Sequence, residues 1–246
     1  MKIFATGGST ILKTLRREAR RWLLWPPVGG IDLGDPDRVR PISEDWGFDR
    51  GQPVDRYFIE SFLFGHATDI RGRVLEVKDN HYTLRFGGDR VTQSDVIHKG
   101  DDNPAATIVA DLAEGDGIPS QAFDCIICTQ TLHLVFDLPA ALRTLHRTLR
   151  PGGVLLATVP AISPITREEK GRYHDYWRFT TVSFRGLCEP LFGSTNLRIV
   201  TYGNVYAAVA FLHGLSVADL DPQKLEAADP NIELIVALRA IREDAG

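Results

Sequence analysis

The chain has 246 residues, of which 43% are hydrophobic and 24% charged, and its formal net charge is −4. These proportions are close to the globular average; they exclude a disordered chain and disfavour a general nucleic-acid binder, which is more often basic. The apolar runs fall far short of the roughly 20 residues that span a bilayer, and three cysteines are too few for a disulfide framework, so we expect reduced thiols and a cytoplasmic protein.

The first 50 residues differ from the rest, and we expect them to form an arm outside a main domain at residues 51–246. In residues 10–25, apolar side chains recur at spacings of three and four while basic ones fall largely on the other face, which predicts an amphipathic helix that ends at Pro26 and Pro27. Two interpretations of its basic face are open. The helix contacts an anionic membrane surface, or, as is commoner, it packs on the parent domain or on a second subunit and leaves its arginines solvated.

Short apolar strands alternate with helices from residue 55 onward. The predicted helices are 55–64, 138–149 and 181–191, with two short ones at 205–215 and 223–228. The predicted strands are 73–77, 91–98, 107–110, 123–128, 154–159, 197–202 and 232–240, with a turn at 151–153 before the fifth. This alternation predicts an α/β fold with a mostly parallel sheet, in which ligands bind at the carboxyl ends of the strands.

Three patterns occur in order along these strands. The first strand carries the acidic residue Glu76, and Asp111-Leu112 follows the third strand. The fourth strand, its helix and the fifth strand together have the form FDxI…LRPGGxLL over residues 123–156. Together with a later DYWRFT segment at 175–180, this series resembles the class I methyltransferases that use S-adenosylmethionine. The resemblance covers roughly residues 55–240.

The resemblance implies a Rossmann-like sheet of seven strands with helices on both faces and an antiparallel last strand beside the fifth. It also implies S-adenosylmethionine as the cofactor and methyl transfer to an oxygen or nitrogen of a small molecule. A sugar of a polysaccharide or natural product is one candidate acceptor, since the segment at 175–180 is similar to one in members that modify small molecules and sugars.

The resemblance also implies a set of cofactor-binding residues at the strand ends and on the helix before the sheet. Glu76 is expected to organise the loop around the cofactor's ammonium group, Asp111 to reach the adenine amino group beside the Leu112 amide, and Asp101 or Asp102 to bind the ribose hydroxyls. The full expected set is Tyr57, Glu76, Asp79, Asn80, Asp101, Asp111, Leu112, Thr129 and Gln130.

Two histidines are candidates for the base that a hydroxyl acceptor needs. His133 follows the fourth strand, and His174 stands beside Asp175 in the later segment, so we expect these three residues to be catalytic. Each of these residues also has a purely structural interpretation. His133 is then an exposed residue at a helix start, and Asp175 pairs with Arg178 while Trp177 packs against the sheet.

The loop after the first strand departs from the family pattern. The family has GxGxG there, and glycine allows positive φ and a close approach of the backbone to a ligand. Here the chain has no glycine between Val77 and Gly87, although Asp79 and Asn80 favour a turn. Two functions therefore remain open: a methyltransferase that holds the amino-acid end of its cofactor differently, or a non-catalytic binding or scaffolding module. A nicotinamide-dependent oxidoreductase has less support, because no GxGxxG motif is present.

Cys125 and Cys128 form a CxxC pattern inside the fourth predicted strand. Residues three apart in a strand point to opposite faces, so the two thiols are badly placed to share a metal ion. We therefore expect two core residues and no metal site.

Overall fold

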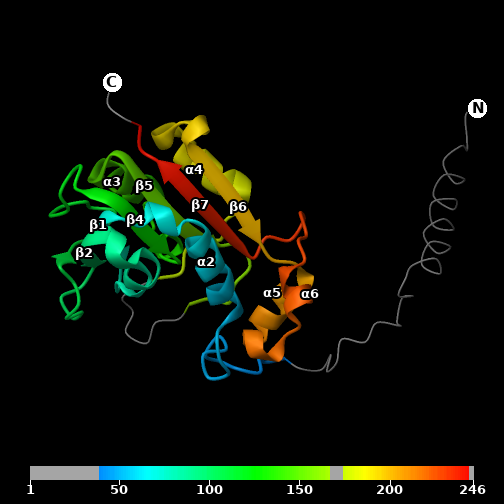
Figure 1. Cartoon of the computed structure of the whole chain (residues 1–246). Helices are drawn as coiled ribbons and strands as arrows, with labels where there is room; N and C mark the ends of the chain where they lie inside the picture. Colours follow the sequence, from blue (N-terminus) through cyan, green and yellow to red (C-terminus); the bar gives the residue numbers. More distant parts are fainter. Residues whose placement is uncertain (1–38, 167–173, 244–246) are drawn as a thin grey trace, which may run out of the picture. The chain divides into compact units, whose positions relative to one another are not determined.

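The computed structural model describes residues 39–166 and 174–243. The predicted helix at 10–25 lies outside this part of the chain, and the expected boundary between an arm and a domain at residue 50 stays a prediction. From Pro41 onward the described residues belong to one compact unit, drawn in colour in Figure 1. Among them, no helix combines the length and the apolar character needed to cross a membrane.

The unit is built on a seven-stranded sheet with the order β3-β2-β1-β4-β5-β7-β6. Strands β1 to β5 are parallel to their neighbours, whereas β7 runs antiparallel between β5 and β6 (Figure 1). The bounds are β1 Gly72–Val77, β2 Val91–His98, β3 Ile108–Val109, β4 Phe123–Thr129, β5 Leu149–Pro160, β6 Leu197–Tyr202 and β7 Ile235–Ile241. This arrangement confirms the predicted α/β fold, including the antiparallel last strand beside the fifth.

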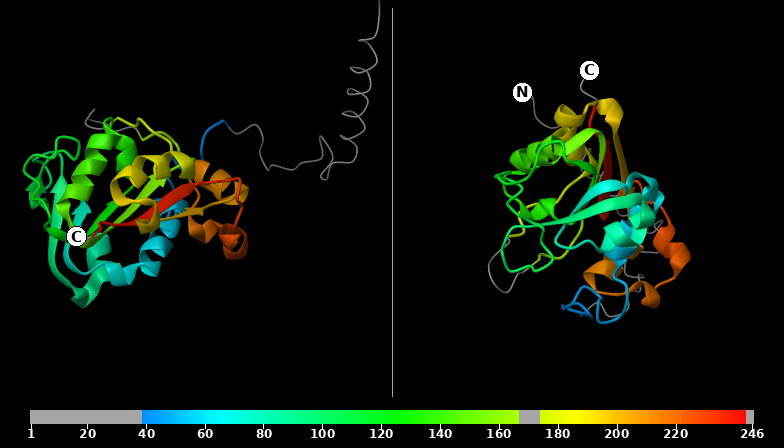
Figure 2. Two further views of the ribbon diagram at one scale, coloured as in Figure 1. Left: turned by 90° about the horizontal axis from the view of Figure 1, so that it is seen from above. Right: turned by 60° about the vertical axis from the view of Figure 1, so that its left-hand side comes forward.

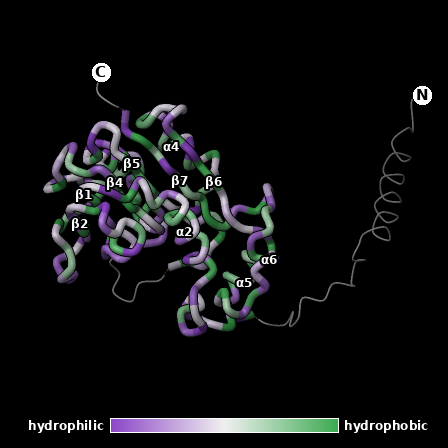
Figure 3. Tube along the Cα trace, in the orientation of Figure 1, coloured by the Kyte–Doolittle hydropathy of each residue, from purple (hydrophilic) through white to green (hydrophobic). Residues whose placement is uncertain are grey.

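Helices cover both faces of the sheet, as Figure 2 shows from two further directions. The helices are α2 Val54–Gly65, α3 Leu138–Thr148, α4 Thr181–Phe192, α5 Val205–Leu212 and α6 Pro222–Glu226. One buried cluster joins α3 and α4 to the first face, and a second joins α2 to the opposite face. A third cluster packs α5 and α6 against the start of α2, and the trace of α5 is hydrophobic along most of its length (Figure 3).

The side-chain alternation of β4 explains the two cysteines in it. Cys128 packs in the cluster on the α3 and α4 face, whereas Cys125 packs in the cluster on the α2 face. Both thiols are fully buried, and burial raises the pKa of Cys128 to about 12. In the described residues, no three His, Cys, Asp or Glu side chains are grouped so as to hold a metal ion.

The predicted turn at residues 151–153 is wrong, because this segment belongs to β5. The Gly152 amide donates to Arg242 O over 2.9 Å, and the Arg242 amide donates to Gly153 O over 2.9 Å. The register shifts between Phe123 and Cys125 on the neighbouring strand, so the chain bulges rather than turns. The proline and glycines that suggested a turn are accommodated by this bulge, with φ of 73° at Gly152.

Residues 41–53 lie against the segment that follows α5. The Ile42 amide donates to His213 O over 2.8 Å, the Val217 amide donates to Gln52 O over 2.9 Å, and Pro53 and Ser216 form an antiparallel bridge. These contacts fix the entry to α2, whose first turn faces the carboxyl ends of the parallel strands.

Candidate cofactor and acceptor site

Glu76 organises the chain that follows β1. Its side chain is buried, and its carboxylate accepts hydrogen bonds from the Tyr82 amide at 3.2 Å, the Thr83 amide at 2.7 Å and the Thr83 hydroxyl at 2.7 Å. Burial raises the pKa of Glu76 to about 7, although the bonds from Thr83 and Tyr82 favour the ionised form. The carboxylate thereby holds a helical turn over residues 81–87 in the place of the family's glycine-rich loop.

Lys78 keeps the backbone conformation that glycine normally supplies. It follows β1 directly with φ of 80°, in the left-handed region that side chains other than glycine rarely adopt. Its amide donates to Ile97 O over 2.9 Å, and its carbonyl accepts from Asn103 Nδ2 over 2.6 Å. These bonds hold the strained residue, so the chain turns over the strand ends without a glycine.

The other expected loop residues make local contacts. Asp79 accepts from the His81 amide at 3.0 Å, and Asn80 donates from Nδ2 to Ser94 Oγ over 3.2 Å. Both therefore shape the turn, as their residue types suggested. Asp101 is exposed in the loop after β2.

Asp111 already has two partners in the folded protein. One oxygen accepts from the Ala113 amide at 2.8 Å, and the other lies 2.7 Å from Lys99 Nζ. Burial favours its neutral form, but the hydrogen bond from Lys99 and that from Ala113 outweigh burial and lower the pKa of Asp111. The neighbouring Leu112 side chain is buried in the cluster on the α3 and α4 face, so only its backbone is available to a ligand.

Arg56, rather than Tyr57, is the residue of α2 that faces the loop after β1. The Tyr57 hydroxyl donates to Glu226 on α6, and its ring packs in the cluster beneath α5 and α6. The Arg56 guanidinium instead lies 3.9 Å from the Asp55 carboxylate, and Tyr82 and Asp79 of the loop after β1 are close enough to favour its charge. Burial opposes its charge, but Asp55 and Tyr82 outweigh burial and raise the pKa of Arg56.

Three buried polar atoms in the described residues have no hydrogen-bond partner, and they gather at the carboxyl ends of β4 and β5. They are Gln130 Nε2, His133 Nδ1 and Thr158 Oγ1. Thr158 pairs with Thr129 at the end of β4, and the Gln130 amide donates to Thr158 O over 2.9 Å. Gln130 itself has φ of 45°. Unpartnered buried groups are rare and costly, so these three atoms are candidates for contact with a ligand.

His133 is buried, so the alternative of an exposed histidine is wrong. Burial lowers the pKa of His133 to about 4, against the attraction of the nearby Asp175 carboxylate. Its carbonyl accepts from the amides of Tyr176 at 2.9 Å and Trp177 at 3.3 Å. The imidazole is therefore neutral near pH 7, and the two bonds to the His133 carbonyl fix the backbone that carries it.

Asp175 lies near His133, but its carboxylate oxygens accept hydrogen bonds from other residues of the protein. It accepts two hydrogen bonds from Arg178, one of them from Nη2 at 2.9 Å, and a third from the Thr166 amide at 2.8 Å. His174 is exposed, with its ring 5.7 Å from that of Tyr176. The structure thus brings Asp175 to His133 and leaves His174 at the surface. Trp177 is not packed beneath the sheet, because 38% of it is exposed.

Comparison with known proteins decides the family. A family model described as a methyltransferase domain matches residues 18–198, which is well over half of the chain. The chain belongs to this family. The match confirms the resemblance to class I methyltransferases that use S-adenosylmethionine.

Relatives of this methyltransferase-domain protein are named for different activities. It is 25% identical over 166 residues to the zebrafish mitochondrial arginine-hydroxylase NDUFAF5, covering 60% of this chain and 51% of the relative. It is 28% identical over 123 residues to 2-phytyl-1,4-naphtoquinone methyltransferase of Synechococcus elongatus, covering 48% of each. It is 31% identical over 107 residues to the ubiquinone/menaquinone biosynthesis C-methyltransferase UbiE of an Enterobacter species, covering 42% of this chain and 40% of the relative. The chain thus spans about half the length of the curated relatives it matches, or less.

Solved structures share the fold. The 4+2 cyclase SpnF aligns with a TM-score of 0.51 at 17% identity, covering 85% of this chain and 88% of its own. A SAM-dependent methyltransferase from Archaeoglobus fulgidus aligns with a TM-score of 0.50 at 11% identity, covering 76% of this chain and 94% of its own. Because the same fold carries a cyclase, the reaction depends on the residues at the strand ends rather than on the fold.

Replacing Lys78 with glycine is expected to stabilise the protein. A residue other than glycine in the left-handed conformation destabilises the folded state by about 1–2 kcal/mol. Glycine removes this strain, but its greater freedom in the unfolded chain offsets part of the gain in stability. K78G should therefore raise the free energy of unfolding by about 0.5–1 kcal/mol in urea denaturation, whereas K78A should not. Equal stability of K78G and K78A would contradict a strained backbone at this position.

The stability of the protein relative to E76Q should depend on pH. Because the pKa of Glu76 is about 7 in the folded protein and lower in the unfolded chain, the stabilising contribution of its protonated form is full below about pH 4.5 and is lost as pH rises through about 7. The wild type should therefore gain roughly 1–3 kcal/mol over E76Q as pH falls from 8 to 5. Urea denaturation at each pH measures this difference, and a constant difference would rule out the raised pKa.

Proposed function

We propose that this protein transfers a methyl group from S-adenosylmethionine to an oxygen or nitrogen of a small molecule. Family membership supports the reaction class, and the cluster of Gln130 Nε2, His133 Nδ1 and Thr158 Oγ1 carries the argument for this chain. Buried polar atoms without partners destabilise a fold, so three of them near a charged arginine favour a ligand-binding site over a scaffold that binds no ligand.

The residues at the strand ends fit the parts of S-adenosylmethionine. Arg56 would hold the carboxylate, because the ion pair that its guanidinium makes in the described residues, with Asp55, is 3.9 Å long and so beyond hydrogen-bond distance. The turn at Lys78, held by Glu76 through Tyr82, would pass beneath the amino-acid end. Asp111 and the Leu112 backbone would face the adenine, with Lys99 as a competing partner of Asp111.

The chain's own groups supply binding, orientation and a proton acceptor. Bound cofactor provides an electrophilic methyl group, and orienting two bound reactants contributes several kcal/mol in such reactions. His133 is neutral, and its unpartnered Nδ1 accepts the proton of an acceptor hydroxyl or amine. Asp175, held by Arg178, stabilises the imidazolium that results.

The identities of the methylated atom and of the acceptor molecule are further parts of this proposal. Two of the matched relatives are quinone-related methyltransferases by name, one of them a C-methyltransferase. The sugar that the segment at 175–180 suggests remains a second candidate. A small-molecule partner, a homo-oligomer and a cytoplasmic location likewise stay proposals.

The proposed role of Arg56 in binding the cofactor carboxylate is tested with two ligands, only one of which carries that carboxylate. S-adenosylhomocysteine carries the amino-acid carboxylate, whereas 5′-methylthioadenosine lacks it. R56Q should weaken binding of S-adenosylhomocysteine by roughly 10-fold or more in calorimetry, because a charge-assisted hydrogen bond is lost, and should leave binding of 5′-methylthioadenosine unchanged.

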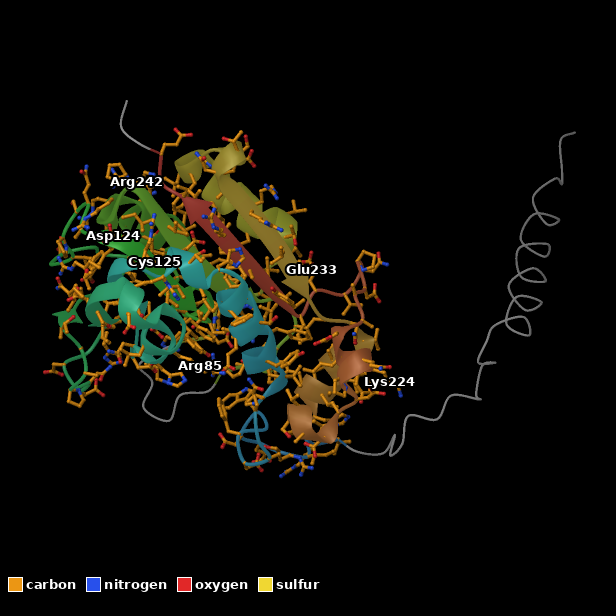
Figure 4. All side chains as sticks on the ribbon, viewed as in Figure 1. Arg85, Asp124, Cys125, Lys224, Glu233 and Arg242 are labelled. Carbon is orange, nitrogen blue, oxygen red and sulfur yellow. The ribbon has the colours of Figure 1, made fainter. Side chains whose placement is uncertain are left out.

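R85Q is the matched control for this experiment. Arg85 lies on the turn after β1 (labelled in Figure 4), where it pairs with Glu60 at 2.8 Å and is about half exposed. R85Q should bind both ligands as the wild type does. Equal losses of both ligands in R56Q would show that Arg56 supports the fold of the site rather than the carboxylate.

A further inference from the structure

An apolar groove opens between the beginnings of α3 and α4. Its volume is about 670 Å³, within the range of small-molecule sites. Phe136, Pro139, Trp177, Val182 and Leu187 supply most of its apolar lining. Since both helices begin just beyond the carboxyl ends of β4 and β5, the groove lies at the ligand-facing edge of the sheet.

Two aromatic rings of the groove are exposed and yet fixed. Phe136 is 69% exposed, and its ring lies 6.0 Å from that of Trp177 at an interplanar angle of 29°. The Trp177 indole donates to Val135 O over 3.0 Å, and the Trp177 amide donates to His133 O. Because the Trp177 ring is already held, it loses little further freedom when a flat ligand stacks on it, which favours binding.

The rings connect the groove to the proposed reaction site. The Tyr176 amide donates to the same His133 carbonyl, and its ring lies 5.3 Å from that of Phe136. Tyr176 thus links the rings that line the groove to the loop that carries His133.

The polar side chains of the groove are already engaged. Asp137 accepts from the Ala140 amide at 3.0 Å, Arg178 binds Asp175, and the Ser183 hydroxyl donates to Thr180 O. A charged ligand would find no free counter-charge among them, and a sugar would find few partners for its hydroxyls. The complementary ligand is uncharged and flat.

We propose that the methyl acceptor is an uncharged aromatic molecule with a hydroxyl group, stacked on Phe136 and Trp177. This rests on the proposed function, which it narrows to one substrate class. In the transfer, the acceptor oxygen bonds to the methyl carbon as the carbon–sulfur bond breaks, and sulfur keeps the electron pair. The hydroxyl proton passes to His133, so charge and atoms balance.

The test uses 2-naphthol as the probe, with 2-naphthalenesulfonate and methyl glucoside as the charged and sugar comparisons. Calorimetry with the full chain should give binding of 2-naphthol at least 10-fold tighter than either comparison. F136A should weaken 2-naphthol binding roughly five- to tenfold, as expected for the loss of one aromatic contact. Tighter binding of methyl glucoside or of the sulfonate would overturn the proposal.

F64A is the matched control, because Phe64 on α2 is 75% exposed and stands outside the groove. It should leave 2-naphthol binding unchanged; equal losses in F64A and F136A would overturn a specific groove. S-adenosylhomocysteine is titrated into the same three proteins. Binding of 2-naphthol without any binding of S-adenosylhomocysteine would defeat the proposed function and leave an aromatic-binding groove, whereas the reverse result would defeat the aromatic acceptor alone.

Discussion

Three hydrogen bonds converge on the buried carboxylate of Glu76, and the ligand-facing edge of the sheet depends on them. A carboxylate buried without donors is costly, so the segment after β1 folds back until Tyr82 and Thr83 supply them. Tyr82 also lies close enough to Arg56 to favour the charge of its guanidinium. The segment held by Glu76 therefore faces the first turn of α2.

This linkage explains how the chain turns after β1 without the glycines of its family. The left-handed residue is still present, but it is Lys78, held by bonds from its neighbours on β2 and the loop after it. The family loop relies on glycine to make that conformation inexpensive. Here hydrogen bonds of the surrounding chain over-determine it instead.

Most of the fold follows from the sequence, because strand burial leaves a direct pattern. The continuous apolar run of β4 predicted a strand buried on both faces, and the spacing of Cys125 and Cys128 predicted that they point to opposite clusters, as they do. The antiparallel β7 came from the resemblance to the family and not from periodicity. The turn predicted at 151–153 was wrong, because proline and glycine are compatible with a β-bulge as well as with a turn.

The site was harder to predict, because its residues are set by contacts distant in the chain. Tyr57 and Arg56 are neighbours, but a helix turns by about 100° per residue, so only one of them faces the loop after β1. The burial of His133 depends on Tyr176 and Trp177, more than 40 residues later. The helical turn at 81–87 depends on Glu76 and has no strong local signal. The helix before the sheet offered both Arg56 and Tyr57, and only its packing in the fold distinguishes them.

Calorimetric titration of the full chain with S-adenosylhomocysteine tests the central idea most directly, that a loop held by Glu76 instead of glycines still forms a cofactor site. One molecule should bind per chain with a Kd of about 100 µM or below, equivalent to roughly −5.5 kcal/mol or better. No heat of binding up to millimolar ligand would contradict the account and would leave a methyltransferase fold that serves another purpose.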